Sequence, residues 1–127
     1  MSLPVRAQVG AAPNFATNLQ QVQAFFESQD AQSAAERMAR LKAELREMKA
    51  MLAWSPACGR TARFLNARSV QARVKAASLV QLATQAGLPF LREYVLAQHL
   101  VLYAHSDSEV VLLALKGHRQ LAYTALQ

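Results

Sequence analysis

The chain of 127 residues lacks several features that mark large classes of protein. Its single cysteine, Cys58, cannot form an internal disulfide, so a reducing cytoplasm is the expected compartment. No apolar run approaches the roughly 18 residues that a membrane span needs, and the start MSLPVRAQVG lacks the apolar core of a signal peptide. We therefore expect one domain, residues 1–127, with no membrane partner.

The common catalytic and metal-binding signatures are also missing. The sequence contains no glycine-rich phosphate loop, no G-x-S-x-G elbow and no H-E-x-x-H pair. His99, His105 and His118 lack the short spacing of zinc ligands. Cys58 precedes Gly59 and Arg60, which is compatible with an activated thiol, but a bystander cysteine is the preferred interpretation. We expect no metal and no cofactor.

The chain carries a net charge of +6, and its segment from Pro56 to Arg92 contains no acidic residue. A solvated basic face is one explanation for this segment. The other, which we favour, is a surface that binds nucleic acid or an acidic protein segment. The candidate binding residues are Arg60, Arg63, Arg68, Arg73, Lys75, Arg92 and Lys116.

The first half of the chain is predicted to form a strand and a helical hairpin. Val5–Val9 alternates apolar and polar residues, and Asn14 is positioned to cap a helix that ends near Ser28. After a polar connection of about four residues, Ser33 and Glu36 form a capping-box pattern. The apolar residues of the second helix repeat at helical spacing: Ala34, Met38, Leu41, Leu45, Met48 and Leu52. The short connection predicts an antiparallel hairpin.

The second half is predicted to contain one helix and three strands. Pro56 ends the second helix, residues 58–60 form a turn, and a helix over about 66–87 ends near Gly87. The expected strands are Leu91–Ala97, His99–His105 and Glu109–Lys116, and the last is apolar enough to lie centrally, buried on both faces. The predicted fold class is α+β, with a small antiparallel sheet made of the N-terminal strand and a three-stranded meander.

Polar residues gather where the last strand ends. Lys116, His118, Arg119 and Tyr123 are close in sequence and offer the acid, base and cation that RNA cleavage requires. A polar sheet edge without catalytic function explains the same residues equally well.

The order of these motifs resembles that of the RelE/ParE toxin superfamily of type II toxin–antitoxin modules, also called plasmid stabilisation proteins. The segments that carry the resemblance are VRAQV, the helical hairpin, PACGR at 56–60, LREYVL at 91–96, HLVLYAH at 99–105 and VVLLALKGHRQ at 110–120. The predicted helix over about 66–87 is an insertion relative to the family. It is either an additional docking surface or a helix that covers the core.

The resemblance implies a small basic toxin that an acidic, DNA-binding antitoxin neutralises, in a toxin–antitoxin hetero-oligomer. Arg92, Tyr103 and the pair His118–Arg119 match the pattern of ParE-like members, which inhibit DNA gyrase. The middle-strand arginine of RelE-like members, which cleave mRNA on the ribosome, would fall near Leu100. A gyrase-type toxin that is not an enzyme is therefore the expected function.

Two alternatives stay open. The chain is compatible with a RelE-like, metal-independent endoribonuclease, for which the resemblance would assign His118, Arg119, Tyr123 and Arg92 as catalytic residues. It is also compatible with a degenerate family member that keeps the fold and antitoxin binding but is not toxic.

Overall fold

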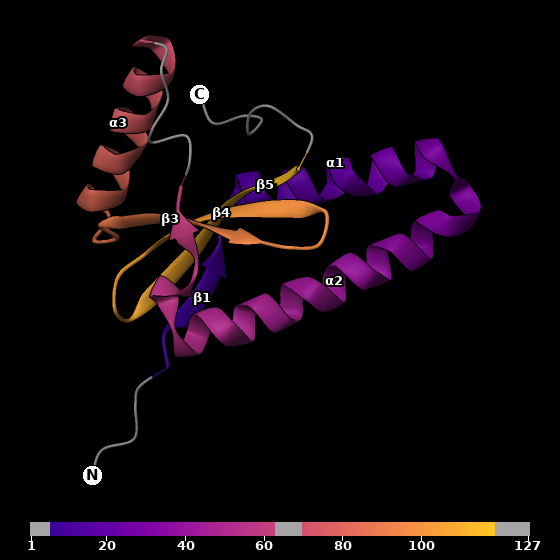
Figure 1. The fold of residues 1–127 in the computed structure, drawn as a ribbon, viewed down its shortest axis with the longest axis horizontal. Coiled ribbons are helices and arrows are strands. Elements are labelled where there is room, and N and C mark those ends of the chain that lie inside the picture. The colour runs from indigo at the N-terminus through magenta and orange to yellow at the C-terminus, as the bar shows by residue number, and fades with distance from the viewer. Residues whose placement is uncertain (1–5, 63–69, 119–127) are drawn as a thin grey trace.

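The computed structural model describes residues 6–62 and 70–118, without the side chains at positions 70–73, 75, 76, 79 and 82. It is a mixed α+β fold with three α-helices and a five-stranded sheet, as the coarse prediction required (Figure 1). The elements are β1 Gln8–Ala11, α1 Pro13–Gln29, α2 Ala31–Trp54, the 3-10 turn η1 Pro56–Cys58, β2 Arg60–Thr61, α3 Val70–Gln85, β3 Phe90–Val95, β4 His99–His105 and β5 Glu109–Gly117.

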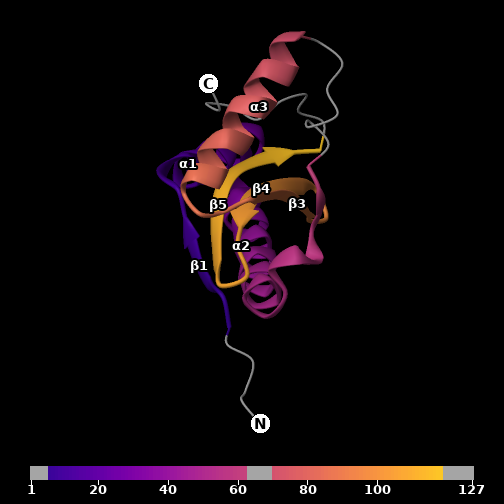
Figure 2. The same ribbon diagram turned by 90° about the vertical axis from the view of Figure 1, so that its left-hand side faces the viewer.

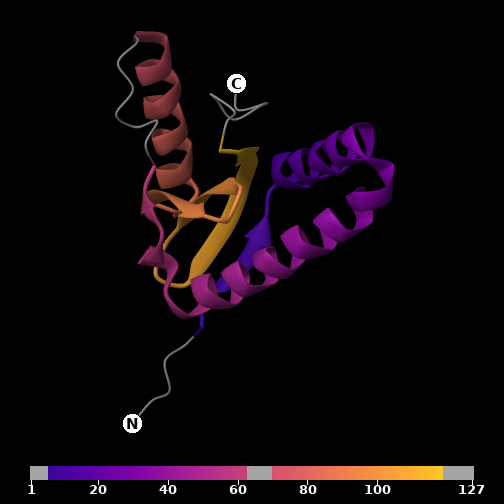
Figure 3. The same cartoon turned by 45° about the vertical axis from the view of Figure 1, so that its right-hand side comes forward.

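Helices α1 and α2 form a hairpin that covers one face of the sheet (Figure 3). The predicted stripe of α2 is confirmed, because all six of its residues from Ala34 to Leu52 are buried. Phe15 and Phe26 of α1 are buried as well, and Leu19 and Val22 pack against the same core. Burial of this continuous apolar surface against the sheet is the main source of stability for the hairpin.

The starts of both helices differ from the predicted ones. Helix α1 begins at Pro13 after Ala12, and Asn14 lies inside its first turn rather than capping it. Helix α2 begins at Ala31, and its cap is Asp30, whose side chain accepts a hydrogen bond from the Gln32 backbone N–H at 3.0 Å. The predicted capping box is therefore wrong: an aspartate three residues earlier already satisfies the first turn. Only one residue separates the helices, not about four.

The sheet has the strand order β1-β5-β4-β3-β2, and its N-terminal strand pairs in parallel with β5. The prediction of a wholly antiparallel sheet is wrong at this edge. The strand begins at Gln8, where its pairing with Glu109 starts, and ends at Ala11, two residues beyond the predicted end; Val5 of the predicted strand lies outside the described residues. The pairs β3–β4 and β4–β5 are antiparallel, so the predicted meander is present.

The central, most buried strand is β4 and not β5, which corrects a second expectation. Every residue of β4 after His99 is buried, whereas β5 alternates between buried and half-buried positions over most of its length. Strand β5 is interior all the same, since β1 and β4 flank it.

Two asparagines of α1 complete the hydrogen bonding of β5 beyond the end of β1. The β4–β5 register shifts between Leu102 and Tyr103, and β1 ends opposite Leu112. Asn14 then donates to the Leu113 carbonyl at 3.0 Å, and the Asn18 carbonyl oxygen accepts from the Leu115 N–H at 3.0 Å. Asn18 is only 2% exposed, so its amide replaces backbone partners that the sheet no longer supplies.

Helix α3 packs on the opposite face of the sheet through its C-terminal half (Figure 2). Val80 and Ala83 contact a second core that contains Leu91, Leu102 and Ala114. The helix ends as predicted: Gly87 has φ of +79°, and the Leu88 N–H donates to the Ala83 carbonyl at 2.8 Å. Residues 66–69 of the predicted helix lie outside the described residues.

The segment predicted as a turn at 58–60 contains more structure. Pro56–Cys58 forms a single 3-10 turn, and Arg60–Thr61 pairs antiparallel with β3 as the short edge strand β2. Ser106–Ser108 forms the predicted turn between β4 and β5, in which the Ser106 hydroxyl accepts from the N–H groups of Ser108 and Glu109.

Candidate functional site

The sheet carries two polar regions, one near each end of the β3–β4 hairpin. The first, which we call the Tyr103 cluster, consists of Pro56, Gly59, Arg92, Tyr103 and His105. The second is a groove between the helical hairpin and the β3–β4 turn, which we call the hairpin groove.

The Tyr103 cluster connects β3 and β4 to the segment of η1 and Gly59 that follows α2. The buried Tyr103 hydroxyl donates to the Pro56 carbonyl at 2.7 Å and accepts from the Gly59 N–H at 2.9 Å. Arg92 donates through Nη1 to the Gly59 carbonyl at 3.2 Å. Burial raises the pKa of Tyr103 to about 12, so the phenol stays protonated at neutral pH. Its hydroxyl links Pro56 and Gly59 through two hydrogen bonds and does not serve as a proton-transfer group.

His105 belongs to the same cluster, and both of its ring nitrogens are occupied. Arg92 donates through Nε to His105 Nε2 at 3.0 Å, which leaves the ring proton on Nδ1. Nδ1 then donates to the Ser106 carbonyl at 2.8 Å. The exposed ring of Phe90 covers the imidazole, with centroids 5.1 Å apart. Neither nitrogen is available to a substrate in this arrangement, so the cluster is structural.

Two of the predicted binding cations are engaged within the fold. Arg92 is held in the Tyr103 cluster, and the Nε of Arg60 lies 3.6 Å from the carboxylate of Glu93. Glu93 is buried and the Arg60 side chain is 33% exposed, so this ion pair is partly shielded from solvent. Lys116 lies on β5 opposite Leu100. The other predicted cations are not described: Arg63 and Arg68 lie outside the described residues, as do the side chains of Arg73 and Lys75.

Cys58 lies beside the Tyr103 cluster at the end of η1. Partial burial raises the pKa of its thiol, and the positive charge of Arg92 opposes this only in part. The thiol is therefore protonated at neutral pH. This environment agrees with the preferred interpretation of Cys58 as a bystander.

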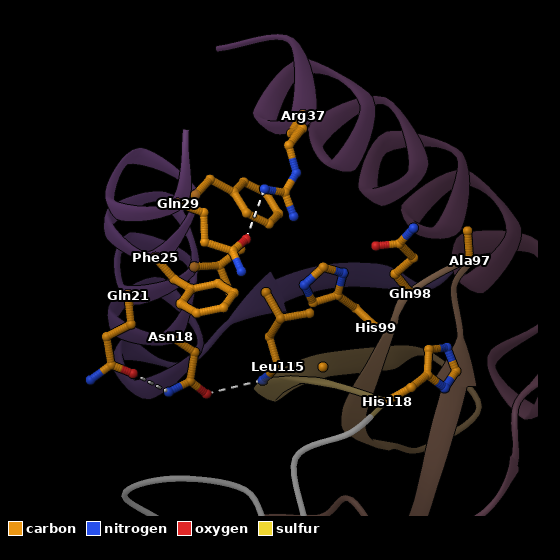
Figure 4. Close-up of a pocket in the computed structure, with 13 residues that line it drawn as sticks. Asn18, Gln21, Phe25, Gln29, Arg37, Ala97, Gln98, His99, Leu115 and His118 are labelled. Atoms are coloured by element: carbon orange, nitrogen blue, oxygen red, sulfur yellow. Dashed lines mark hydrogen bonds between the residues drawn. The ribbon is translucent and has the colours of Figure 1, made fainter. Parts of the chain in front are cut away.

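The hairpin groove has a volume of about 1010 Å³ and is open to solvent (Figure 4). One wall is α1, including Phe25 and Gln29, and Arg37 reaches in from α2. The other wall is formed by the β3–β4 turn and the end of β5, which place His99 and His118 in the groove. Packing of the hairpin diagonally over the sheet creates this space, because the connection between the helices lies beyond the strand ends (Figure 1).

The groove side chains are held by specific contacts. Arg37 donates to the Gln29 side chain at 2.9 Å and lies over the ring of Phe26, 4.0 Å from its centroid. His118 Nε2 donates to the Leu96 carbonyl at 2.9 Å, so its proton is on Nε2. Burial lowers the pKa of His99, although the nearby Glu44 carboxylate opposes the effect. His99 is therefore neutral at pH 7.

Of the predicted catalytic residues, the structure describes Arg92 and His118, and it does not bring these two into one site. Arg92 lies in the Tyr103 cluster, whereas His118 binds the carbonyl of Leu96. Leu96 is four residues beyond Arg92, which is about 13 Å along the chain at the usual rise per residue of a strand. Arg119 and Tyr123 lie outside the described residues.

The sequence interpretation did not identify the hairpin groove. It left Arg37 and Phe25 unassigned and considered His99 only as a metal ligand. The one feature of the sequence that points to the groove is Phe25, an aromatic residue beside the apolar stripe of α1 rather than in it. Such a residue is exposed unless something else covers it.

Comparison of the chain with protein-family models and with curated proteins gives no match. Within residues 6–62 and 70–118, no helix is both long and apolar enough to cross a bilayer. In the same part of the chain, no group of three or more His, Cys, Asp or Glu side chains is arranged to hold a metal ion.

Proposed function

We propose that the chain is the toxin of a type II toxin–antitoxin module, similar to ParE, and inhibits a target such as DNA gyrase by binding it. The observation that carries the proposal is the order and packing of the elements. A short strand leads into a helical hairpin on one face of the sheet, and a C-terminal meander follows. The quoted motifs coincide with these elements: PACGR with η1 and β2, LREYVL with β3, and HLVLYAH with β4. Such a toxin acts in the cytoplasm.

The chemistry of the sheet favours binding over RNA cleavage. A nuclease needs its acid, base and cation within reach of one phosphate. Arg92 is instead held by His105 and Gly59, at a distance from His118. Leu100, at the position where the resemblance would place a catalytic arginine, is 6% exposed.

One observation favours the endoribonuclease alternative. His99 and His118 line the same groove, and neutral His99 is suited to accept a proton from a ribose hydroxyl. Metal-independent cleavage of mRNA would then use the groove rather than the sheet face.

Induced expression in a bacterial host, followed by two assays of the purified protein, tests the proposal. We expect growth arrest, inhibition of gyrase supercoiling and intact ribosome-bound mRNA. Cleavage of that mRNA with normal supercoiling would refute the gyrase-type mechanism. Normal growth would identify a degenerate member without toxicity.

The endoribonuclease alternative has its own test. Substitution of His118 by Ala together with Tyr123 by Phe removes both candidate proton donors, so a nuclease would lose its toxicity. Unchanged toxicity of the double variant excludes a nuclease that depends on them. An adjacent reading frame for a short acidic, DNA-binding protein would support the toxin–antitoxin assignment.

A further inference from the structure

Strand β1 forms one edge of the sheet, and no strand in the described part of the chain pairs with its outer side (Figure 2). In a parallel ladder, the N–H and C=O groups of every second residue point toward the same neighbouring strand. The N–H groups of Gln8 and Ala12 donate to carbonyls along β5 and the turn before it, at 3.0 and 2.8 Å. The backbone groups of Val9 and Ala11 therefore point outward, away from the sheet.

This open edge has defined ends. Before it, the Ala7 N–H already donates to the Ala53 carbonyl at the end of α2, at 2.8 Å. After it, Pro13 has no N–H and begins α1, which leaves the edge and packs over β5. An added strand thus meets two residues with outward donors and acceptors, placed symmetrically on either side of Gly10.

The edge lacks the features that usually prevent strands from pairing between molecules. Charged residues, proline and bulges protect exposed edges, and Gln8–Ala11, with the sequence QVGA and an unbroken register with β5, has none of them. The opposite edge is β2, which is only two residues long and includes Arg60. Pairing between molecules is therefore favoured at β1 over β2.

Exposed apolar side chains lie at one end of this edge. The last turn of α2, which the Ala7 N–H contacts at Ala53, leaves Met51 and Trp54 exposed by 51% and 56%. Arg6 lies over the Trp54 ring, 4.5 Å from its centroid. Two residues of strand pairing give few hydrogen bonds, so a stable contact also needs apolar surface. The end of α2 supplies such surface.

We propose that the outer edge of β1 pairs with the same edge of a second copy of this chain, about a two-fold axis at Gly10. Antiparallel pairing about this axis sets Val9 opposite Ala11 of the second copy, and Ala11 opposite its Val9. Each of these two pairs exchanges two hydrogen bonds, which makes about four in all. The two sheets then join into one continuous sheet.

The short edge favours a second copy over a peptide strand. A two-fold contact brings in the exposed end of α2 from both chains, whereas a peptide would meet it only once. The strand residues carry no charge, so the edge does not repel its own copy even though the chain has a net charge of +6.

Sedimentation velocity from micromolar to millimolar protein concentration tests the inference. We expect a monomer–dimer equilibrium that added salt does not weaken, because uncharged strands form the contact and salt screens the repulsion between the two basic chains. A chain that stays monomeric over the whole range would overturn the inference, and so would a dimer that dissociates as salt is added.

Cross-linking locates the axis. The Cα atoms of a non-hydrogen-bonded antiparallel pair are about 4.5 Å apart, which a disulfide can span. Gly10→Cys in a Cys58→Ser background should therefore form a covalent dimer when treated with oxidised glutathione. Gln20→Cys, at an exposed position of α1, should not. Equal cross-linking at the two positions would place the interface elsewhere and overturn the inference.

Two variants are designed to break the contact. Gly10→Lys sets like charges opposite each other at the axis, and a Cβ at this position meets nothing within 4 Å in the chain itself. Ala11→Pro removes an outward N–H, a change that edge strands tolerate. Each is expected to raise the dissociation constant of the dimer about tenfold or more.

The matched controls change the same residue types away from the edge. Gln20→Lys adds the same charge on α1, and Ala31→Pro places proline at the first position of α2, where helices accept it. Both should dimerise like the unaltered chain, and circular dichroism checks that all four variants are folded. If folded edge variants dimerise as tightly as the controls, β1 is not the interface.

This inference does not rest on the proposed function. A chain that dimerises through β1 but neither arrests growth nor inhibits gyrase would refute the toxin proposal alone. Growth arrest and gyrase inhibition by a chain that stays monomeric would refute the dimer alone.

Discussion

The Tyr103 cluster and the hairpin groove contain similar residue types but differ in how those residues are used. In the cluster, Arg92 and His105 bond to each other and to backbone carbonyls, and Tyr103 is fully buried. In the groove, Arg37 and the two histidines lie along an open surface with an exposed phenylalanine. Arginine and histidine side chains are thus engaged in contacts with each other inside the cluster, whereas in the groove they line an open surface without pairing with each other in the described contacts.

The strongest test of the cluster is Gly59→Ala. A Cβ at this position would lie 2.5 Å from the Tyr103 hydroxyl and 2.7 Å from the Glu93 carbonyl, and the second atom belongs to the backbone. We expect a loss of about 3 kcal/mol in the free energy of unfolding, measured by urea denaturation. Gly10→Ala is the control, since a Cβ there meets nothing within 4 Å. Similar losses in the two variants would show that close approach at Gly59 is not the cause.

A smaller loss is expected for Tyr103→Phe. The change leaves the Gly59 N–H and the Pro56 carbonyl without the hydroxyl that joins them, while the ring still fills its place in the core. The expected cost is about 2 kcal/mol of unfolding free energy. Tyr94→Phe, on the neighbouring strand and half-buried, should cost less than about 0.5 kcal/mol. A Tyr103→Phe variant as stable as the original chain would contradict the structural role of the cluster.

The groove predicts a pH effect through His99. Burial lowers the pKa of His99 in the folded chain, so the unfolded chain binds a proton more readily. The contribution of His99 to stability is therefore full above the unfolded pKa of about 6.5 and decreases as the pH falls through that value toward the folded pKa. Urea denaturation of the chain and of His99→Gln should show the original losing more stability than the variant between neutral and acidic pH. Parallel losses would contradict the lowered pKa.

The smallest stability effect is expected for Phe25→Ser. Because Phe25 is largely exposed and contributes little to the core, its removal should change the unfolding free energy by less than about 0.5 kcal/mol. Thermal denaturation checks this directly. A large loss would mean that Phe25 is part of the core.

Local patterns in the sequence were sufficient to predict most of the secondary structure. The α2 stripe, the bounds of β4 and the end of α3 shortly before Gly87 were predicted because each depends on neighbours close in sequence. The start of α2 was wrong because two capping residues compete, and Asp30 satisfies its first turn before Ser33 can. The parallel pairing of β1 was missed because it joins segments about a hundred residues apart.

The candidate sites were less predictable than the fold. His118 and Arg92 were identified as residue types suited to catalysis, but nothing in their spacing indicates that one lies at the β3–β4 turn and the other beside Gly59. Arg37 was not identified, since its place in the groove depends on the packing of the hairpin opposite the β3–β4 turn and the end of β5.

Apolar periodicity and turn residues in the chain alone therefore determine its α+β class, its helices and its meander, because burial and backbone geometry act over a few residues. The tertiary structure decides which polar groups are hydrogen-bonded within the fold and which remain accessible to solvent. The structural role of Tyr103 depends on Gly59 lying within hydrogen-bonding distance of its hydroxyl. The position of Phe25 at the groove depends on the hairpin extending past the strands. Both depend on contacts between distant segments, whose geometry no local pattern encodes.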